Sequence, residues 1–396
     1  MLGMMLRDLR LSPLRTTLTA LSMLMGVVAV ICASLIGSIG ASALEATNAQ
    51  VSGRASTYAT SVAIDGGLTL DAERMERLAE RTGAIGDGAM APVVSVGTTI
   101  AVTSPQASGT PIDVVGADMV FTTCSYRGIY LLPLVDGTWL SGESDEAGVQ
   151  IVVNEAARQK VGGTGSEVHL ASKRTRTVAT ATIAGIVNDG VATPRYYVNA
   201  VSFALLEPQL WDPIGLVVYW HPETGTVAEH EVSSLVGDLA YDVLAGKVSG
   251  VRWVDAGETY AAVVRSLQLA FAACGGLLLF VAALGMVNIG LADVEQRSHE
   301  LLIRRALGSS RGEVMVLVCG SSLMLSGIVS ALSVAMSAVA VGCIPYLLPS
   351  DSPIPAPAYP YDAVWQAVAA AVATALLGSV APAVKAARLE PSMVLR

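Results

Sequence analysis

Charged residues are scarce in this sequence, and their scarcity is uneven. Asp, Glu, Lys and Arg make up 14% of the 396 residues, whereas soluble proteins carry about 25%. Four stretches contain none of them: Thr16–Leu44, Ser266–Ala292, Val314–Ser350 and Ala363–Val384. Each is longer than the roughly 20 apolar residues that cross a bilayer. The composition excludes an ordinary soluble protein and predicts four transmembrane helices, one followed by a long interval and then three close together.

The sequence also lacks the motifs of several enzyme classes. It contains no GxxxxGK[ST] phosphate-binding loop, no HExxH and no CxxC, so we expect no nucleotide site, metal site or catalytic residue within it. Gly308–Gly312 does fit the GxSxG pattern of a nucleophile elbow. That pattern needs a preceding strand with His and acidic partners, and here it lies between two predicted spans, so we expect no nucleophile there.

Cysteine is nearly absent from the long interval between the first two spans. Of the five cysteines only Cys124 lies there, so this region has no internal disulfide. We expect Cys124 to be a small buried residue.

The distribution of Lys and Arg predicts the orientation. The segment before the first span, the link between the second and third, and the segment after the fourth together hold ten basic and six acidic residues, whereas residues 351–362 contain no Lys or Arg. The positive-inside rule therefore places both termini and the link at 293–313 in the cytoplasm, and the long interval outside. The outside portion is acidic, which argues against a nucleic-acid partner there.

The long interval has the pattern of a mixed α/β domain. Residues 93–102, 112–115, 149–153, 177–187 and 216–220 are rich in β-branched residues and predict strands. Apolar residues at helical spacing predict helices over 71–82 and 227–244, and Asn154 is a candidate cap for a helix over 155–161. Residues 254–265 are expected to form a second stalk that leads into the second span.

The link between the second and third spans predicts a short amphipathic helix. Arg297, Glu300, Arg304 and Arg311 share one face, and Leu302, Ile303, Ala306 and Leu307 form an apolar face. From the residues alone, two interpretations are open. The helix is an interfacial helix with positive-inside arginines, or it is a docking element for a cytoplasmic partner.

Four segments resemble the ABC-transporter permeases of the MacB/FtsX type, also called type VII. The link resembles the family pattern E-x-R-x-x-E-x-x-x-R-[RK]-A-[LI]-G at Glu295, Arg297, Glu300 and Arg304–Gly308, although Leu302 and His299 stand where the family often has Gly and Arg. The other matching segments are Leu14–Thr19, Gly137–Leu140 with Val149–Gly162, and Pro382–Pro391 with Leu395-Arg396. The size of the outer domain favours MacB-like permeases over FtsX-like ones.

The resemblance implies a membrane permease that is not itself an enzyme. It implies work as a dimer with a second permease copy or a paralogue, driven by a cytoplasmic dimer of a separate ABC ATPase that binds ATP and Mg. Movement of the link would pass through the stalks to the outer domains, a mechanism called mechanotransmission. An extracytoplasmic adaptor is a further expected partner, and the expected cargo is a peptide, antibiotic or lipid-like molecule exported across a bacterial plasma (inner) membrane. The alternative is an FtsX-like signalling scaffold that regulates a cell-wall hydrolase.

The resemblance also implies the site residues. The candidate ATPase-docking residues are Arg297, Glu300, Leu302, Ile303, Arg304, Arg305, Ala306, Leu307 and Gly308. Small residues four apart, Ala33, Gly37 and Ala41, form a candidate dimer seam. The expected organisation is a cytoplasmic segment 1–15, span one with its stalk 16–44, outer core domain 45–265, span two 266–292, cytoplasmic coupling loop 293–313, span three 314–343, outer loop 344–362, span four 363–384 and cytoplasmic tail 385–396.

Overall fold

The computed structural model divides into two compact units. It describes residues 13–63, 70–103, 118–142, 148–172, 177–223, 225–254, 257–296, 298–306, 309–347, 352, 354, 359 and 361–388. The helical unit comprises Met1–Ala41, Ala261–Leu347 and Ala356–Arg396, and the sheet unit comprises Ser42–Tyr260 and Leu348–Pro355. The boundaries between the units fall within helices α2 and α8, so each of these helices contributes residues to both.

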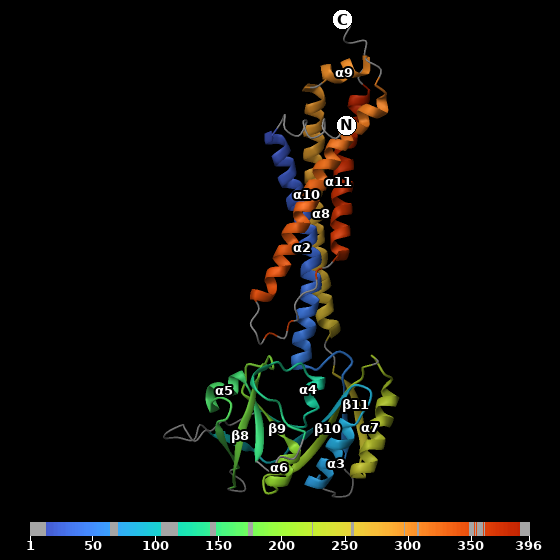
Figure 1. Cartoon of the computed structure of the whole chain (residues 1–396). Coiled ribbons are helices and arrows are strands. Elements are labelled where there is room, and N and C mark those ends of the chain that lie inside the picture. Colours follow the sequence, from blue (N-terminus) through green and yellow to red (C-terminus); the bar gives the residue numbers. More distant parts are fainter. Residues whose placement is uncertain are drawn as a thin grey trace. The chain divides into compact units, whose positions relative to one another are not determined.

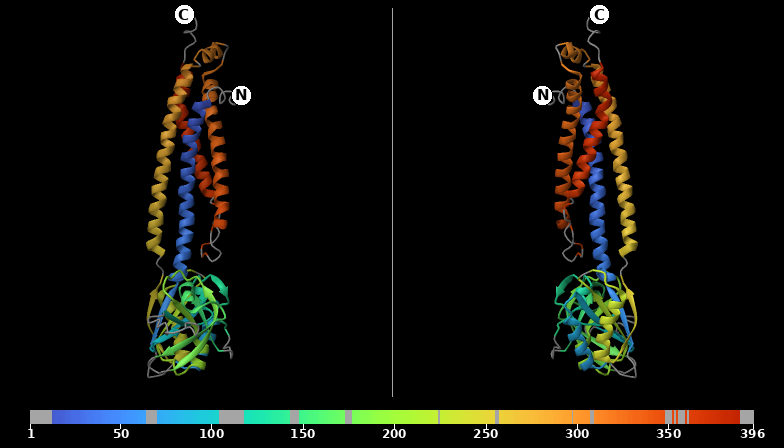
Figure 2. Two further views of the ribbon diagram at one scale, coloured as in Figure 1. Left: turned by 90° about the vertical axis from the view of Figure 1, so that its left-hand side faces the viewer. Right: turned by 90° about the vertical axis from the view of Figure 1, so that its right-hand side faces the viewer.

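The helical unit is built from four long apolar helices and one short one (Figure 1, Figure 2). These are α2 (Pro13–Val51), α8 (Gly257–Gln296), α9 (Ser298–Ala306), α10 (Arg311–Leu347) and α11 (Tyr361–Ala387). Within the described residues, four of them are long and apolar enough to cross a membrane. Together with the sheet unit between the first and the later helices, they confirm the predicted fold class and make this a multi-pass membrane protein.

Glycines allow α8 to approach both α2 and α11 closely. A Cβ atom at Gly26 would lie 2.7 Å from the side chain of Leu279, and one at Gly275 would lie 2.9 Å from Val30. Further along α8, a Cβ at Gly290 would meet the ring of Pro382, and one at Gly378 would meet Met286. Close backbone approach at small residues is the usual way in which membrane helices associate.

The sheet unit is centred on one long mixed sheet. Its strands run in the order β11-β1-β10-β2-β4-β9-β6-β8-β7-β3, with β5 paired to β8. Their bounds are β1 (Tyr58–Ala63), β2 (Ala89–Val96), β3 (Ile100–Thr103), β4 (Asp118–Thr122), β5 (Leu134–Gly137), β6 (Val149–Asn154), β7 (Glu167–Ser172), β8 (Val178–Val187), β9 (Arg195–Asn199), β10 (Pro213–His221) and β11 (Lys247–Trp253). Most pairs are antiparallel, but β4 with β9 and β6 with β8 are parallel.

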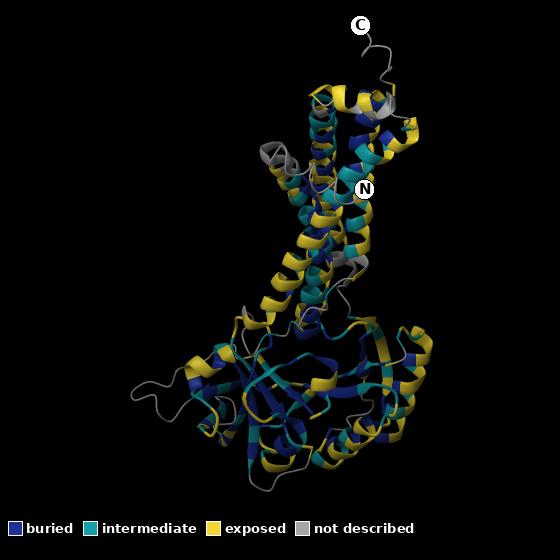
Figure 3. Ribbon diagram, turned by 45° about the horizontal axis from the view of Figure 1, so that its top comes forward, coloured by how far each residue is buried: buried dark blue, intermediate teal, exposed yellow. Residues whose placement is uncertain are grey.

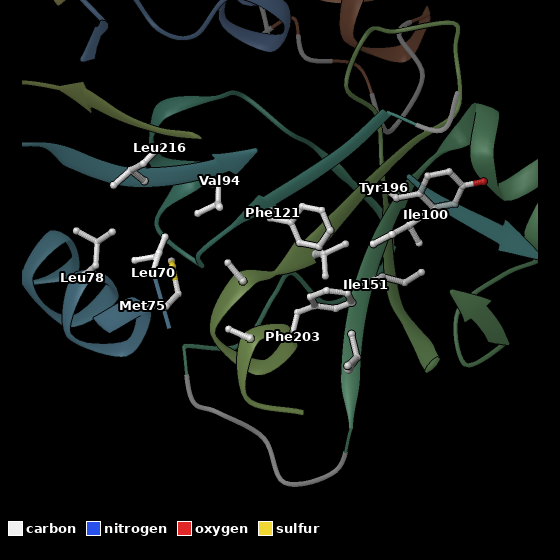
Figure 4. Packing of buried hydrophobic residues seen from close by; sticks show 14 of the residues in the cluster. Leu70, Met75, Leu78, Val94, Ile100, Phe121, Ile151, Tyr196, Phe203 and Leu216 are labelled. Carbon is white, nitrogen blue, oxygen red and sulfur yellow. The ribbon is translucent and has the colours of Figure 1, made fainter. Parts of the chain in front are cut away.

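Both faces of this sheet are buried in its middle. Along β9, Tyr196 and Val198 enter one apolar cluster while Tyr197, between them, enters another. The first cluster includes residues of α3 (Ala72–Gly83), α5 (Glu155–Val161), α6 (Ala200–Leu206) and α7 (Glu229–Leu244), and Figure 4 shows Met75, Leu78 and Phe203 among them. The second includes α4 (Tyr126–Ile129). Alternate side chains therefore face opposite layers, as the strand period of two requires.

Two helix predictions in this unit are confirmed at their caps. The Asp71 side chain accepts a hydrogen bond from the Arg74 backbone N–H at the start of α3. The Asn154 side chain does the same for Ala157 at the start of α5, which ends at Gly162 in a positive-φ conformation. Each side chain satisfies a backbone donor that the first helical turn leaves without an intrahelical partner.

Two other predictions for this unit were wrong in detail. The strand expected over 93–102 is two strands, β2 and β3, which pair with different neighbours. The chain bends at Gly97, directly after the last residue of β2, where a Cβ atom would lie 2.8 Å from the side chain of Ile214. Cys124 is exposed, although we expected it to be buried. The strand predicted over 112–115 lies outside the described residues.

Candidate functional site

The coupling loop at 293–313 is fixed at both ends to α11. Val294 at the end of α8, Val314 at the start of α10 and Ala386 near the end of α11 form one buried apolar cluster. Beside it, Lys385 of α11 forms an ion pair with Glu295 of α8. Three of the long helices therefore meet at the ends of this loop.

The start of α10 is held by a reciprocal capping box. The Ser310 backbone N–H donates to the Glu313 carboxylate at 3.1 Å, and the Glu313 N–H donates to the Ser310 hydroxyl at 3.2 Å. Ser310 is the serine of the GxSxG pattern, and its hydroxyl caps this helix. The S-x-x-E spacing was a sequence signal for this cap, and our sequence analysis missed it.

Helix α9 contains the middle of the predicted docking set. It runs across the end of α8 in Figure 1. Leu302 is buried and Ile303 is 43% exposed, because successive residues of a helix point about 100° apart. The apolar face that was predicted as one surface is thus divided. Leu302 packs within the chain, and Ile303 is exposed to the surroundings. Glu300 is exposed on the same helix.

The remaining docking residues are only partly described. Arg304, Arg305 and Ala306 lie in α9 by their backbone, but their side chains are not described, so the predicted Glu300–Arg304 pair stays a prediction. Arg297, Leu307 and Gly308 lie outside the described residues. Contact with an ATPase is likewise a prediction for this whole set.

The candidate dimer seam has a use within the chain. Ala33 is 5% exposed, and a Cβ atom at Gly37 would collide with the Gln268 side chain of α8. Only Ala41 of the three is exposed. The spacing therefore does mark a close approach of helices, but for Gly37 the neighbour is α8 of the same chain. A seam between two copies stays a prediction.

In the sheet unit, the end of α2 is docked on two loops. The Leu131 N–H donates to the Ala49 carbonyl and the Arg54 N–H to the Ile129 carbonyl, each at 2.9 Å. The Gln50 side chain, 4% exposed, donates to the Asn188 carbonyl at 2.9 Å. Gly53, at a φ of 95° that favours glycine, ends the helix. We call residues 48–54 with the loops 128–131 and 188–190 the α2 dock.

The buried carboxylate of Asp189 fixes the loop at 188–190 by hydrogen bonds. Asp189 is 2% exposed and accepts hydrogen bonds from Asn154 Nδ2, the Tyr197 hydroxyl and the Val191 N–H. Burial, followed by the charge of Asp189, raises the pKa of Tyr197, so Tyr197 remains a neutral donor at physiological pH. Because Asn154 and Tyr197 belong to β6 and β9, the loop that receives Gln50 is fixed to the centre of the sheet.

Both helices that leave the sheet unit attach to the same pair of strands. β1 follows the α2 dock, and β11 precedes α8. Strands β1 and β11 pair in antiparallel fashion, with Tyr58 opposite Trp253. The two rings stack with centroids 6.3 Å apart, and the Val254 N–H donates to the Thr57 carbonyl. Sequence reasoning could not find this arrangement, since about 195 residues separate Tyr58 from Trp253.

Family comparison assigns both units. Residues 16–225 match the MacB-like periplasmic core domain family, and residues 272–391 match the FtsX-like permease C-terminal family. The first match alone covers more than half of the sequence.

Individual relatives align over shorter regions. The macrolide export ATP-binding/permease protein MacB of Brucella abortus is 28% identical over 154 residues, 39% of this chain and 22% of that protein. The pyoverdine export ATP-binding/permease protein PvdT of Pseudomonas putida is 32% identical over 130 residues, 33% of this chain and 19% of that protein. The alignments thus span about a fifth of the length of these relatives. The crystal structure of the periplasmic region of MacB from Actinobacillus actinomycetemcomitans aligns with a TM-score of 0.36 and 14% identity, covering 53% of this chain and 92% of that one.

Proposed function

This chain belongs to the ABC-transporter permeases of the MacB/FtsX type, and from that membership we propose that it couples an ATPase to movement of its sheet unit for export. The ATPase, with its ATP and Mg, is a separate cytoplasmic subunit that acts as a dimer. The permease acts with a second copy or a paralogue. The MacB and PvdT relatives are named for macrolide export and pyoverdine export. These names support export of a peptide, antibiotic or lipid-like molecule.

The observation that carries this proposal is the attachment of the coupling loop. The cluster of Val294, Val314 and Ala386 and the Glu295–Lys385 ion pair join it to three long helices. An ATPase that moved α9 would therefore move α8, α10 and α11 together. A loop that served only as an interfacial helix would not need fixation at both ends.

The sheet unit is suited to receive such a movement. α2 and α8 attach to the adjacent strands β1 and β11, and α2 is also hydrogen-bonded to the loops at 128–131 and 188–190. A shift of one helix relative to the other would shear this strand pair. We propose that shear here is how movement reaches the sheet unit, and that an extracytoplasmic adaptor or cargo protein responds to it.

The proposal includes an orientation in the bacterial plasma (inner) membrane. The excess of Lys and Arg in the segments 1–15, 293–313 and 385–396 supports cytoplasmic termini and an extracytoplasmic sheet unit. The native thiol of Cys124, exposed on the sheet unit, tests this in intact cells once the other four cysteines are replaced by serine. We expect a membrane-impermeant maleimide to label it from outside, and labelling only after the cells are opened would reverse the orientation.

The coupling role is tested on Glu300 and Ile303, whose side chains are exposed on α9. We expect Glu300→Arg and Ile303→Asp to abolish co-purification of the ATPase and export, because loss of a buried charged contact at an interface costs about 2–5 kcal/mol. Glu300→Gln and Ile303→Leu are the matched controls, which retain size and should retain partial function. Full assembly and export by both disruptive variants would reduce α9 to an interfacial helix.

An FtsX-like scaffold that regulates a cell-wall hydrolase is the second candidate function. The FtsX-like match is confined to residues 272–391, whereas the sheet unit matches the MacB-like core domain. This division favours export. Capture of a hydrolase by the sheet unit, with no export in cells, would favour the scaffold instead.

A further inference from the structure

Exposed aromatic side chains gather at one end of α11, and basic residues follow at the other. Tyr361 and Trp365 are each 73% exposed, while Lys385 and Arg388 lie at the opposite end. Twenty residues separate Trp365 from Lys385, a length of about 30 Å in a helix, which is the thickness of the hydrocarbon core. Tryptophan and tyrosine favour the membrane interface, where an amphipathic ring is partly in water.

The close contacts of α8 identify the residues of the other helices that lie at the same depth as Trp365. Gly378 meets Met286 and Pro382 meets Gly290, so α8 and α11 run parallel with an offset of 92 residues. Trp365 therefore lies at the level of Ala273, two residues from Phe271, which is 41% exposed.

Closer to the start of α8, the residue numbers of three contacts with α2 add up to the same total, 305: Gly26 with Leu279, Val30 with Gly275, and Gly37 with Gln268. The two helices are antiparallel, and Ala273 lies at the level of Cys32. For α10, the hydrogen bond between Ser337 Oγ and the Tyr359 hydroxyl, at 2.7 Å, places Ser337 beside the start of α11, six residues before Trp365.

A count from the opposite end gives nearly the same levels. The charged residues that end the apolar stretches there are Arg15 on α2, Asp293 on α8, Glu313 on α10 and Lys385 on α11. Twenty residues from each lie Leu35, Ala273, Ser333 and Trp365. The two routes agree within about four residues, or roughly 6 Å along a helix, although one uses helix contacts and the other uses only charges.

We propose that Phe271, Tyr361 and Trp365 form an aromatic girdle that binds the headgroup interface of one bilayer leaflet, with Trp365 at its hydrocarbon boundary. This inference rests on membrane spanning and not on the proposed function. Its consequence is that the helices are longer than the membrane. Residues 257–272 of α8, about 24 Å, and residues 334–347 of α10, about 21 Å, lie beyond the boundary.

The girdle therefore separates the exposed apolar residues of the long helices into two groups, one outside the hydrocarbon core and one inside it. Hydropathy alone does not distinguish these groups. Val263, Leu267 and Leu269 on α8 and Tyr346 on α10 are exposed by 47% or more, and all of them lie outside the hydrocarbon by this placement. Phe280, 60% exposed, lies about 10 Å inside it, seven residues from Ala273.

The test is the depth of Trp365, the only tryptophan outside the sheet unit. The full chain is reconstituted in phosphatidylcholine vesicles that carry bromine either near the headgroup or near the end of the acyl chain. Subtraction of Trp365→Phe isolates the signal of Trp365. We expect the shallow bromine to quench it at least twofold more than the deep bromine.

Two further probes complete a ladder of depth in the Trp365→Phe background. Phe280→Trp should show the reverse ratio, with the deep bromine stronger, and Tyr346→Trp should be quenched by neither. Deep quenching of Trp365, or absence of quenching at both depths, would overturn the girdle. Equal quenching at positions 346 and 280 would overturn the boundary. Because Trp365 is native, its result stands even where an introduced tryptophan disturbs the fold.

Discussion

Helix α11 buries small apolar residues, whereas helix α3 buries large ones. On α11, Ala367, Ala371 and Ala375 are fully buried, while Leu377 is 71% exposed. On α3, Met75 and Leu78 are fully buried, and the exposed face carries Glu and Arg. Figure 3 shows the same contrast on a larger scale, with exposed residues along the long helices and buried residues through the sheet.

The contrast shows that the two units are adapted to different solvents. In water, burial of a large apolar side chain stabilises a fold by about 1.5–3 kcal/mol. In lipid this term disappears, because the acyl chains are as apolar as leucine, and close packing of small residues drives association instead. A leucine is therefore essential where it is buried in α3, as at Leu78, and replaceable where it is exposed on α11, as at Leu377.

The largest expected effect follows from this for Leu78. Leu78→Ala removes a fully buried side chain from the main cluster of the sheet unit and should destabilise that unit by about 2–5 kcal/mol. Leu377→Ala makes the same change on the exposed face of α11 and should be near neutral. Thermal unfolding of the full chain, followed by tryptophan fluorescence, measures the first, since four of the five tryptophans lie in the sheet unit. Equal losses in both variants would break the comparison.

The reverse substitution should damage the helical unit. Ala371→Leu inserts a large side chain where the exposed fraction is zero, and overpacking costs about 1–3 kcal/mol. We expect a lower temperature of aggregation in detergent, measured by size-exclusion chromatography of heated samples. Ala371→Ser, which preserves size, is the control. A fully stable Ala371→Leu protein would mean that this face of α11 is not closely packed.

Local features were predictable from the sequence because their causes are local. The four long helices follow from the missing charges, and the caps at Asp71 and Asn154 follow from side chains that reach only three residues along the chain. The prediction of a continuous strand over 93–102 failed at Gly97, where the chain bends against Ile214, because tertiary contacts can override local β-propensity.

Features that join distant residues were beyond the sequence. The Glu295–Lys385 pair spans 90 residues, and the packing of Gln268 on Gly37 joins two predicted spans whose contact no local pattern specifies. The spacing of Ala33, Gly37 and Ala41 indicated a close approach, but not which helix would make it. The apolar face predicted on α9 was divided for the same reason, because only the tertiary fold decides that Leu302 is buried while Ile303 is exposed.

A smaller effect is expected in the α2 dock, where the sheet unit uses a buried polar side chain. Gln50→Leu keeps the volume but removes the donor to the Asn188 carbonyl. The expected cost is about 1 kcal/mol, with a larger loss of export than of stability if the dock transmits movement. Its neighbour Val51 is 49% exposed, so Val51→Ala is the matched control. Normal export by a destabilised Gln50→Leu protein would limit the dock to a structural role.

The smallest effect is a pH dependence that should appear in the sheet unit. Burial, with a smaller contribution from Arg54, lowers the pKa of His221 below 6.5, although a hydrogen bond to the Ala55 backbone and the charge of Glu223 oppose the shift. The folded protein therefore favours the neutral ring, and the unfolded chain takes up the proton first. Stability is lost as pH falls through 6.5 toward the pKa of the folded state, by less than about 1.4 kcal/mol per pH unit for one proton. His221→Gln cannot titrate, so it should reduce this slope without changing it above pH 7.5. Tryptophan-monitored unfolding of the full chain at pH 7.5, 6.5 and 5.5 gives the measurement, and an unchanged slope in His221→Gln would assign the pH dependence to other groups.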